Sequence, residues 1–299
     1  MNHDYIIFGY RVRSAFELDA YACDFDTPEI IVENGQISCF NEELAEDGFH
    51  FSLDENLIAF YVPDVGTYEI RNGNRIIVEP DKGARLQDIT LFILGSAFGF
   101  LMHQKKVYPL HGSTVDLGDR CLILVGHSGA CKTSLASGFV EQGYKLLTDD
   151  VSRIEYIDTD HYVHPSYPSQ KIWKDGAHHL QLKYNPENRV LRELDKFYFN
   201  SRDRFSDSRK PLVGIIEIVP SEVHTPVLIQ LEKPAVLNAL IMHSYLQEVI
   251  GGKTDVGAHL RFCSKLCESI PVYRIMRPYD GFTVKDQVEA IMTTFEKRI

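Results

Sequence analysis

The residues most able to do chemistry form a small-residue turn between an apolar strand pattern and a helical pattern. The apolar run 122–125 enters the turn, and a helical pattern covers residues 132–142. Small residues let backbone N–H groups surround phosphate oxygens, and a helix N-terminus adds donors and a partial positive charge. The turn therefore predicts a P-loop that binds ATP. Its candidate nucleotide-binding residues are Gly126, His127, Ser128, Gly129, Ala130, Cys131, Lys132, Thr133 and Ser134.

Two side chains of this loop have predicted tasks in phosphoryl transfer. Lys132 would reach the β- and γ-phosphates, and the Thr133 hydroxyl would ligate Mg²⁺. The usual pattern, G-x-x-x-x-G-K-[ST], has glycine where this chain has Cys131. If that position needs a positive φ, a side chain there costs about 1–2 kcal/mol; if only closeness to phosphate matters, cysteine is small enough. The thiol also makes the site sensitive to oxidation. The other interpretation of the motif is a structural glycine turn.

A pair of carboxylates follows the helical pattern, at the end of the short strand pattern 145–148. Asp149 and Asp150 suit two tasks, because one can hold Mg²⁺ or its water while the other accepts a proton from a hydroxyl nucleophile. His111 opens the strand pattern that precedes the apolar run. The alternative interpretations are a capped turn for the two aspartates and a hydrogen-bonded core histidine for His111.

Together these motifs resemble the HPr kinase/phosphorylase family, whose kinase domain has a P-loop fold related to phosphoenolpyruvate carboxykinase. The family pattern is His-Gly before a strand, then G-x-S-G-x-G-K-[ST], a helix, and G-[HY]-x-L-x-x-D-D. The chain carries His111-Gly112, the loop 126–133 and the stretch 143–150 in that order and at similar intervals. The resemblance implies an α/β fold with a P-loop kinase domain of this type, using ATP and Mg²⁺.

The resemblance also implies a role for each matching residue. Asp149 matches the catalytic carboxylate that activates the acceptor serine hydroxyl. Asp150, with Thr133, matches the Mg²⁺ neighbourhood. His111 matches a histidine that lines the same site, and Lys132 and the loop amides would hold the triphosphate.

The chain departs from the HPr kinases after the paired aspartates. Their glycine-rich signature, E-[IV]-R-G-x-G, is replaced by residues 165–175, which contain a P-x-x-P…W pattern. This layout resembles the HPr-kinase-like enzymes encoded with lasso peptides, which phosphorylate a serine at the C-terminal end of the precursor peptide. The expected partner is therefore a peptide or small protein with an acceptor serine.

Three other functions stay open at this point. The first is an HPr-type protein serine kinase/phosphorylase. The second is a nucleotide-binding regulatory protein without turnover, which Cys131 favours. The third is a metabolic P-loop kinase with a small-molecule hydroxyl acceptor.

Two further segments have both a functional and a structural interpretation. Lys171 and Trp173 alternate on a predicted strand and would share a face, where they would contact nucleotide or peptide; the alternative for Trp173 is core packing. The polar segment 200–210 carries a single large apolar residue, Phe205. It is either a solvated loop or a mobile loop that grips a substrate.

The organisation of the chain changes near residue 85. Before it, strand patterns surround two hairpin signals, Asn34-Gly35 and Asn72-Gly73. After it, strand and helix patterns alternate, which is typical of an α/β domain. We therefore predict a smaller β-rich region over residues 1–85 and a P-loop kinase domain over residues 86–299. Helices are predicted over 235–250 and 284–298.

Composition limits the class of protein. Hydrophobic residues make up 44% of the chain and charged residues 24%, which are globular values. The net charge of −11 argues against binding to nucleic acid or to an anionic membrane, since phosphate contacts need Lys and Arg.

Three further features of the sequence bear on the cellular compartment of the protein. None of the six cysteines forms a C-x-x-C pair, and free thiols predict a reducing compartment. The first residues lack the pattern of a signal peptide. Apolar residues recur at helical spacing over residues 86–104. Their most apolar stretch, 89–102, is shorter than the about 20 residues that span a bilayer, so it predicts a buried core helix. We expect a cytoplasmic protein, and analogy with the family suggests a homo-oligomer.

Overall fold

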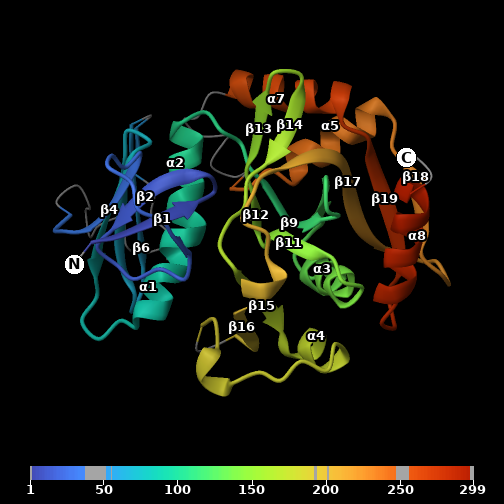
Figure 1. Cartoon of the computed structure of the whole chain (residues 1–299), viewed down its shortest axis with the longest axis horizontal. Coiled ribbons are helices and arrows are strands. Elements are labelled where there is room, and N and C mark those ends of the chain that lie inside the picture. The colour runs from blue at the N-terminus through green and yellow to red at the C-terminus, as the bar shows by residue number, and fades with distance from the viewer. Residues whose placement is uncertain are drawn as a thin grey trace. The chain divides into compact units, whose positions relative to one another are not determined.

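The computed structural model describes residues 2–37, 52–54, 56–191, 194–200, 202–246 and 256–296. The chain divides into two compact units (Figure 1). The first comprises Met1–Pro109 with Tyr245–His259, and the second comprises Leu110–Ser244 with Leu260–Ile299. The boundaries of these units follow Pro109, Ser244 and His259, so they differ from the predicted division near residue 85. The prediction of a mixed α/β protein is confirmed.

The first unit is built on an eight-stranded sheet with the order β3-β1-β2-β4-β8-β7-β6-β5. Its inward side chains, such as Val12, Ile30 and Ile76, are fully buried and alternate with more exposed ones. The strands are β1 (His3–Ile7), β2 (Tyr10–Ser14), β3 (Tyr21–Ala22), β4 (Ile30–Asn34), β5 (Ser52–Asp54), β6 (Leu57–Val62), β7 (Gly66–Arg71) and β8 (Arg75–Pro80).

The two hairpin signals have different outcomes. Asn72 and Gly73 both have positive φ and join β7 to β8 in an antiparallel hairpin, as predicted. The hairpin predicted at Asn34-Gly35 is wrong, because β4 lies between β2 and β8 and is parallel to both. Pairing with distant strands determines the place of β4, and the local turn signal does not.

A long helical segment follows the sheet of the first unit. It consists of α1 (Leu86–Phe92), a π-helical turn η2 (Ile93–Ala97) and α2 (Phe98–Gln104). The segment has the bounds of the predicted helical pattern, 86–104. Among the described residues it is the one helix long and apolar enough to cross a membrane, and 67% of its most apolar window is buried inside the protein. The burial agrees with the predicted core helix.

The second unit is built on a nine-stranded mixed sheet. Strands β10, β17 and β19 are parallel neighbours, and β9 pairs with β10 in the antiparallel direction. β18 lies beside β19, and β11 and β12 pair with β9. The strands are β9 (Leu110–Asp116), β10 (Cys121–Val125), β11 (Lys145–Thr148), β12 (Val151–Ser152), β13 (Ile154–Ile157), β14 (Asp160–Val163), β17 (Lys210–Ser221), β18 (Val227–Gln230) and β19 (Val272–Pro278).

Helices cover both faces of this sheet. α5 (Lys233–Met242) and α7 (Val256–Ser269) contribute to the core on the face of Ile123 and Val125. α3 (Lys132–Glu141) packs against α8 (Val284–Glu296) on the other face, where Phe295 and Leu122 approach Gly214. The apolar residues of β10 are buried on both faces, as expected for a central strand.

One helix ends before its predicted bound, and the predicted last helix, 284–298, agrees with α8 over the residues that the structure describes. The helix predicted over 235–250 ends at Met242, because Ser244 instead pairs with Leu110 at the start of β9. Residues 247–250 of that prediction lie outside the described residues, as do residues 297 and 298 of the predicted last helix. Neither α7 nor β19 was predicted from the sequence.

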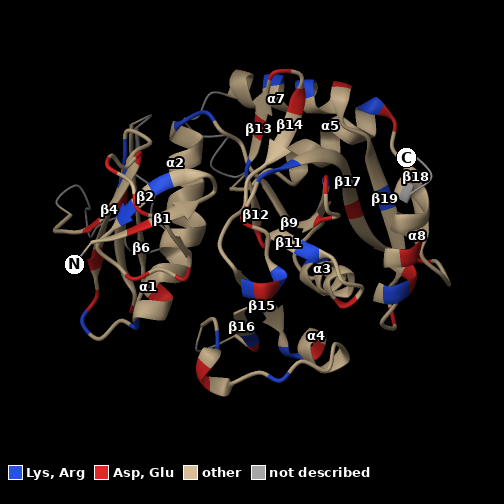
Figure 2. Cartoon of the chain, in the orientation of Figure 1, with Lys and Arg blue, Asp and Glu red and all other residues tan. Residues whose placement is uncertain are grey.

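A small two-stranded sheet completes the second unit. β15 (Ser169–Trp173) pairs with β16 (Lys196–Asn200), and α4 (Lys174–His179) follows β15 directly. Figure 2 shows Lys and Arg interspersed with Asp and Glu along the ribbons of both units.

Candidate functional site

The strand, loop and helix predicted around residue 126 are present. β10 ends at Val125, α3 begins at Lys132, and the loop between them spans residues 126–131. A side chain at Gly126 would not fit, because its Cβ would lie 2.9 Å from the carbonyl oxygen of Ile218 and 3.0 Å from the Cβ of Ala130. Glycine therefore lets the 126–131 loop leave β10 against the neighbouring strand β17.

Cys131 lies at the N-cap of α3 with φ 75° and ψ 30°, a left-handed conformation. The structure thus decides between the two interpretations of this position, since the backbone there has a positive φ. A residue with a Cβ pays about 1–2 kcal/mol for this conformation. The departure from glycine at position 131 is therefore a strained one.

We expect Cys131→Gly to raise the free energy of unfolding by about 0.5–1 kcal/mol, the relief of strain less the entropy that glycine loses on folding. Urea denaturation measures the change. Cys131→Ala is the matched control, because alanine also carries a Cβ. If the alanine variant gained as much stability as the glycine variant, loss of the thiol and not relief of backbone strain would be the cause.

Lys132 folds back over the loop that precedes it. Its Nζ donates to the carbonyl oxygens of Gly126 at 2.8 Å and His127 at 3.3 Å. Burial lowers the pKa of Lys132, while Asp150 and Asp149 oppose that shift. The side chain thus spans the 126–131 loop, the place where a P-loop lysine holds phosphate oxygens.

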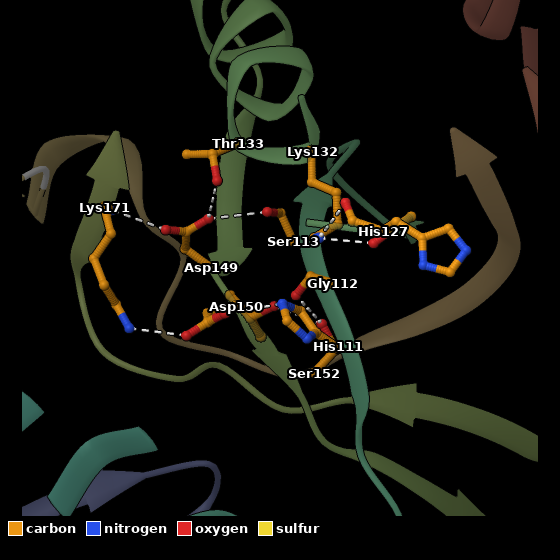
Figure 3. A network of polar contacts seen from close by, with 12 residues as sticks. His111, Gly112, Ser113, His127, Lys132, Thr133, Asp149, Asp150, Ser152 and Lys171 are labelled. Carbon is orange, nitrogen blue, oxygen red and sulfur yellow. Dashed lines mark hydrogen bonds and ion pairs between the residues drawn. The ribbon is translucent and has the colours of Figure 1, made fainter. Parts of the chain in front are cut away.

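Asp149 is buried and accepts three hydrogen bonds. Oδ1 accepts from Ser113 Oγ at 2.9 Å and from Thr133 Oγ1 at 3.3 Å, and Oδ2 accepts from the backbone N–H of Lys171 at 2.9 Å (Figure 3). Burial raises the pKa of Asp149, and the Lys171 N–H opposes the shift. A carboxylate held by hydroxyl groups and with a raised pKa is suited to accept a proton.

Asp150 has a left-handed backbone, with φ 84°, and a different electrostatic environment. Its Oδ2 accepts from Lys171 Nζ at 2.9 Å, and its Oδ1 lies 3.3 Å from His111 Nε2. Burial favours a higher pKa, but Lys171 and His111 outweigh it and hold the pKa of Asp150 well below its usual value. Asp150 is therefore anionic, while burial favours the protonated form of its neighbour.

A cluster of buried hydroxyl groups fixes the turn that carries both aspartates. Thr148 Oγ1 and Thr114 Oγ1 each lie 2.7 Å from Ser152 Oγ, which donates to the carbonyl oxygen of Gly112 at 3.0 Å. The backbone N–H of Gly112 donates to the carbonyl oxygen of Asp150 at 3.0 Å. Residues on both sides of the turn are thus bonded to β9, so the carboxylates have a fixed position.

His111 and Gly112 have the positions that the resemblance implied, beside the paired aspartates. Gly112 permits close packing, because a Cβ there would lie 2.5 Å from the carbonyl oxygen of Leu124. The backbone N–H of His111 donates to the carbonyl oxygen of His243 at 2.7 Å, and its imidazole faces Asp150. His111 is partly exposed, so it is not the core histidine of the alternative interpretation.

One cavity of about 550 Å³ brings these residues together within the second unit. Gly126 and Ala130 are buried, and His127 is exposed with its ring 5.4 Å from that of His243; these three predicted residues do not line the cavity. The other predicted residues line it: His111, Ser128, Gly129, Cys131, Lys132, Thr133, Ser134, Asp149 and Asp150.

Several lining residues were not predicted. Arg277, at the end of β19, places its Nε 3.4 Å from the carbonyl oxygen of Ala130 and donates to Cys131 Sγ at 3.6 Å. Lys196, on β16, lies with its Nζ 5.6 Å from the centre of the Trp173 ring. Both cations line the cavity, so positive charge reaches it from three elements: α3, β16 and β19.

The structure distinguishes between the alternative interpretations of Trp173 and of the polar segment 200–210. Trp173 is 44% exposed and lines the cavity, so core packing is wrong for it. In the polar segment, Phe205 is buried, and the backbone N–H of Ser206 donates to the carbonyl oxygen of Leu146 at 2.7 Å. No described residue of that segment lines the cavity, so the structure gives no support to a loop that grips a substrate there.

The residues present fit a bound Mg²⁺. No cluster of three or more His, Cys, Asp or Glu that could hold a metal occurs among the described residues. Mg²⁺ in kinases needs fewer ligands from the protein, because substrate phosphates and water complete the coordination that one or two carboxylates begin. Thr133 and the anionic Asp150, the two predicted ligands, both line the cavity and supply that kind of donor set. The Thr133 hydroxyl itself donates to Asp149 and not to Asp150.

Among known proteins, the likeness of this chain is to solved structures and is distant. No family model matches the chain, and no curated protein matches it. Among solved structures, the Hpr(Ser) kinase/phosphatase from Coxiella burnetii is 10% identical, with 64% of this chain and 97% of that chain covered and a TM-score of 0.33. Because the TM-score is low, the assignment of the site rests on its own geometry and not on this likeness.

Proposed function

We propose that the chain is an ATP- and Mg²⁺-dependent kinase that phosphorylates a serine hydroxyl. The observation that carries the proposal is the arrangement of Asp149, which is hydrogen-bonded to Thr133 at the start of the helix that follows the 126–131 loop. A phosphate-binding loop and a buried carboxylate that share one cavity are what phosphoryl transfer to a hydroxyl requires.

The reaction is an in-line transfer of the γ-phosphoryl group. The bond between the γ-phosphorus and the β,γ-bridging oxygen breaks, a bond from the serine Oγ to the phosphorus forms, and ADP leaves. Asp149 takes the proton that the serine hydroxyl loses. Lys132 and the N–H groups of the loop hold the phosphates and offset their charge, so catalysis is mostly positioning and electrostatic stabilisation.

The neighbouring side chains keep the base in position. Thr133 and Asp150 would hold Mg²⁺, which would neutralise charge on the β- and γ-phosphates. Asp150 stays anionic through Lys171 and His111 and adds negative charge on the metal side of the site. Ser113 orients Asp149 through Oδ1, and the Lys171 N–H does so through Oδ2.

We infer that the acceptor is a serine of a peptide, namely the C-terminal serine of a lasso-peptide precursor. The support is the sequence resemblance, together with a cavity whose wall contains Trp173, Lys196 and Arg277 around the carboxylates. A cytoplasmic setting fits this proposal, and Cys23, Cys121, Cys131, Cys263 and Cys267 are free. HPr-type protein kinase/phosphorylase activity is the second candidate and differs in its acceptor.

Titration calorimetry with Mg-ATP tests the nucleotide site. We expect Lys132→Ala to remove binding, because the variant loses the ammonium group that holds the phosphates. Lys145→Ala is the control, since Lys145 is exposed on β11 and does not line the cavity. If wild-type protein bound no Mg-ATP, or if Lys132→Ala bound it as tightly as wild type, the proposed site would be wrong.

A second experiment separates a kinase from a regulatory protein without turnover. The strained Cys131 is the observation that favours the regulatory protein. Wild-type protein is incubated with Mg-[γ-³²P]ATP and a set of serine-terminated peptides, beside Cys131→Gly. Transfer by wild type supports the kinase, transfer by the glycine variant alone indicates a disabled site, and nucleotide binding without transfer by either favours the regulatory protein.

A further inference from the structure

An aromatic pair lies in the wall of the same cavity. His179 is the last residue of α4, and Phe282 belongs to the segment between β19 and α8. Their rings stack with centroids 4.7 Å apart and planes only 13° from parallel. Both side chains line the cavity, and Phe282 is 41% exposed. Exposed aromatic rings that gather in a cavity mark a place where a ligand covers them.

A series of neighbouring residues connects the catalytic carboxylate, Asp149, to this aromatic pair. The path begins with Ser113 and Asp149 and passes through Thr133 to the next residue of α3, Ser134. Ser134 Oγ lies 3.1 Å from the position of a Cβ on Gly176, in α4. His179 is one helical turn beyond Gly176, on the same side of α4, and it reaches Phe282.

A triphosphate has a defined direction along this path. Its γ-phosphate belongs beside Asp149, where the acceptor is activated, and its β-phosphate belongs at Lys132 and Thr133. The remaining part of the nucleotide then leaves the 126–131 loop past Ser134, toward α4. Among the aromatic residues that line the cavity, His179 on α4 and Phe282 form a stacked pair.

We propose that the stacked pair His179–Phe282 is the subsite for the purine base of the nucleotide, an inference that rests on the proposed function. A purine presents a flat π-face, and stacking on an aromatic ring strengthens binding about tenfold or more per base. Trp173 lies in a different part of the cavity wall. Lys196 lies over its ring, and Lys171 on the same strand, β15, bonds to Asp149 and Asp150.

The test compares ATP with inorganic tripolyphosphate, which has the phosphates but no base. Calorimetry is done on wild type, Phe282→Leu and Phe282→Tyr, all with Mg²⁺. We expect Phe282→Leu to weaken ATP binding about tenfold or more, since leucine keeps the apolar bulk and loses the ring. Tripolyphosphate binding should be unchanged in both variants, and Phe282→Tyr should bind ATP as wild type does. Tyr156→Leu is the matched control, because Tyr156 is 44% exposed on β13 and does not line the cavity.

Each contrary outcome identifies which proposal has failed. If wild type binds ATP no more tightly than tripolyphosphate, or if Phe282→Leu leaves ATP binding unchanged, the base subsite is wrong and the kinase proposal stands. If Phe282→Leu weakens both ligands equally, Phe282 supports the loop and does not bind the base. If wild type binds neither ligand, the phosphate site and the subsite fail together.

Discussion

Replacing Asp149 by asparagine should lower kcat by about 10²–10⁴-fold, the contribution of a general base, and should leave ATP binding intact. The amide has nearly the shape of the carboxylate, and its oxygen still accepts hydrogen bonds from Ser113 and Thr133. It cannot take the proton from the acceptor hydroxyl. The rate at which Asp149→Asn forms phosphorylated peptide from ATP and the unmodified peptide measures the first effect, and calorimetry with ATP measures the second.

The control for this prediction is Asp119→Asn. The Asp119 side chain is 84% exposed, next to Gly118 in the turn between β9 and β10, and it does not line the cavity. Turnover by the Asp149 variant at the wild-type rate would refute the role of Asp149 as the base. Loss of ATP binding along with turnover would instead indicate that Asp149 acts through the metal and the nucleotide.

The same assignment predicts the acid side of the pH profile. Because burial raises the pKa of Asp149, the base becomes protonated at a higher pH than an exposed aspartate, whose pKa is about 3.9. On the acid side, kcat/KM should therefore fall at a pH above that ordinary value. A profile with its acid limb at or below the ordinary value would contradict the assignment.

The second large effect is expected from Lys171, whose ammonium group is buried against Asp150. Lys171→Met keeps much of the volume and removes the charge, which leaves Asp150 with His111 alone. Breaking a buried ion pair from one side costs about 3–5 kcal/mol. We expect a loss of about 3 kcal/mol in the free energy of unfolding, because the Asp150 side chain is 27% exposed.

A double variant makes this prediction specific to the ion pair. Lys171→Met with Asp150→Asn removes both charges, so it should recover most of the lost stability while the site stays inactive. Loss of less than about 1 kcal/mol in the single variant, or no recovery in the double variant, would contradict the electrostatic account. If Lys171→Met left ATP affinity and peptide kinetics unchanged, the functional interpretation of Lys171 would fail.

The effect should depend on pH in a defined way. The pKa of Asp150 is well below its usual value and that of Lys171 well above its usual value in the folded protein. The stabilisation is therefore fully present between the unfolded pKa values, about 4 and 10.4, and is lost as the pH falls through the folded pKa of Asp150. Wild type and Lys171→Met should converge in stability in strong acid.

The parts of the site that follow one another in the chain could be predicted from the sequence. An apolar run, a small-residue turn and a helical period are local signals, and they predicted β10, the 126–131 loop and α3. The resemblance implied that His111 and the paired aspartates lie near this loop, and the structure places them beside it.

The parts that depend on distant pairing could not be predicted. Arg277 reaches the loop because β19 lies parallel to β17, which in turn lies parallel to β10. Nothing in the local sequence of β19 indicates that neighbour. The hydroxyl cluster of Thr114, Thr148 and Ser152 is likewise assembled from three strands. The Asn34-Gly35 signal gave the wrong hairpin for the same reason, because sheet order was determined elsewhere.

The position of Trp173 makes the protein its own optical probe. It is the single tryptophan of the chain, it is partly open to water, and it lies in the wall of the cavity. Indole emission depends on the polarity around the ring, so any ligand that displaces water there changes the spectrum, and no other tryptophan contributes a background. Occupancy of this one cavity is therefore readable from the intrinsic fluorescence of the unlabelled chain.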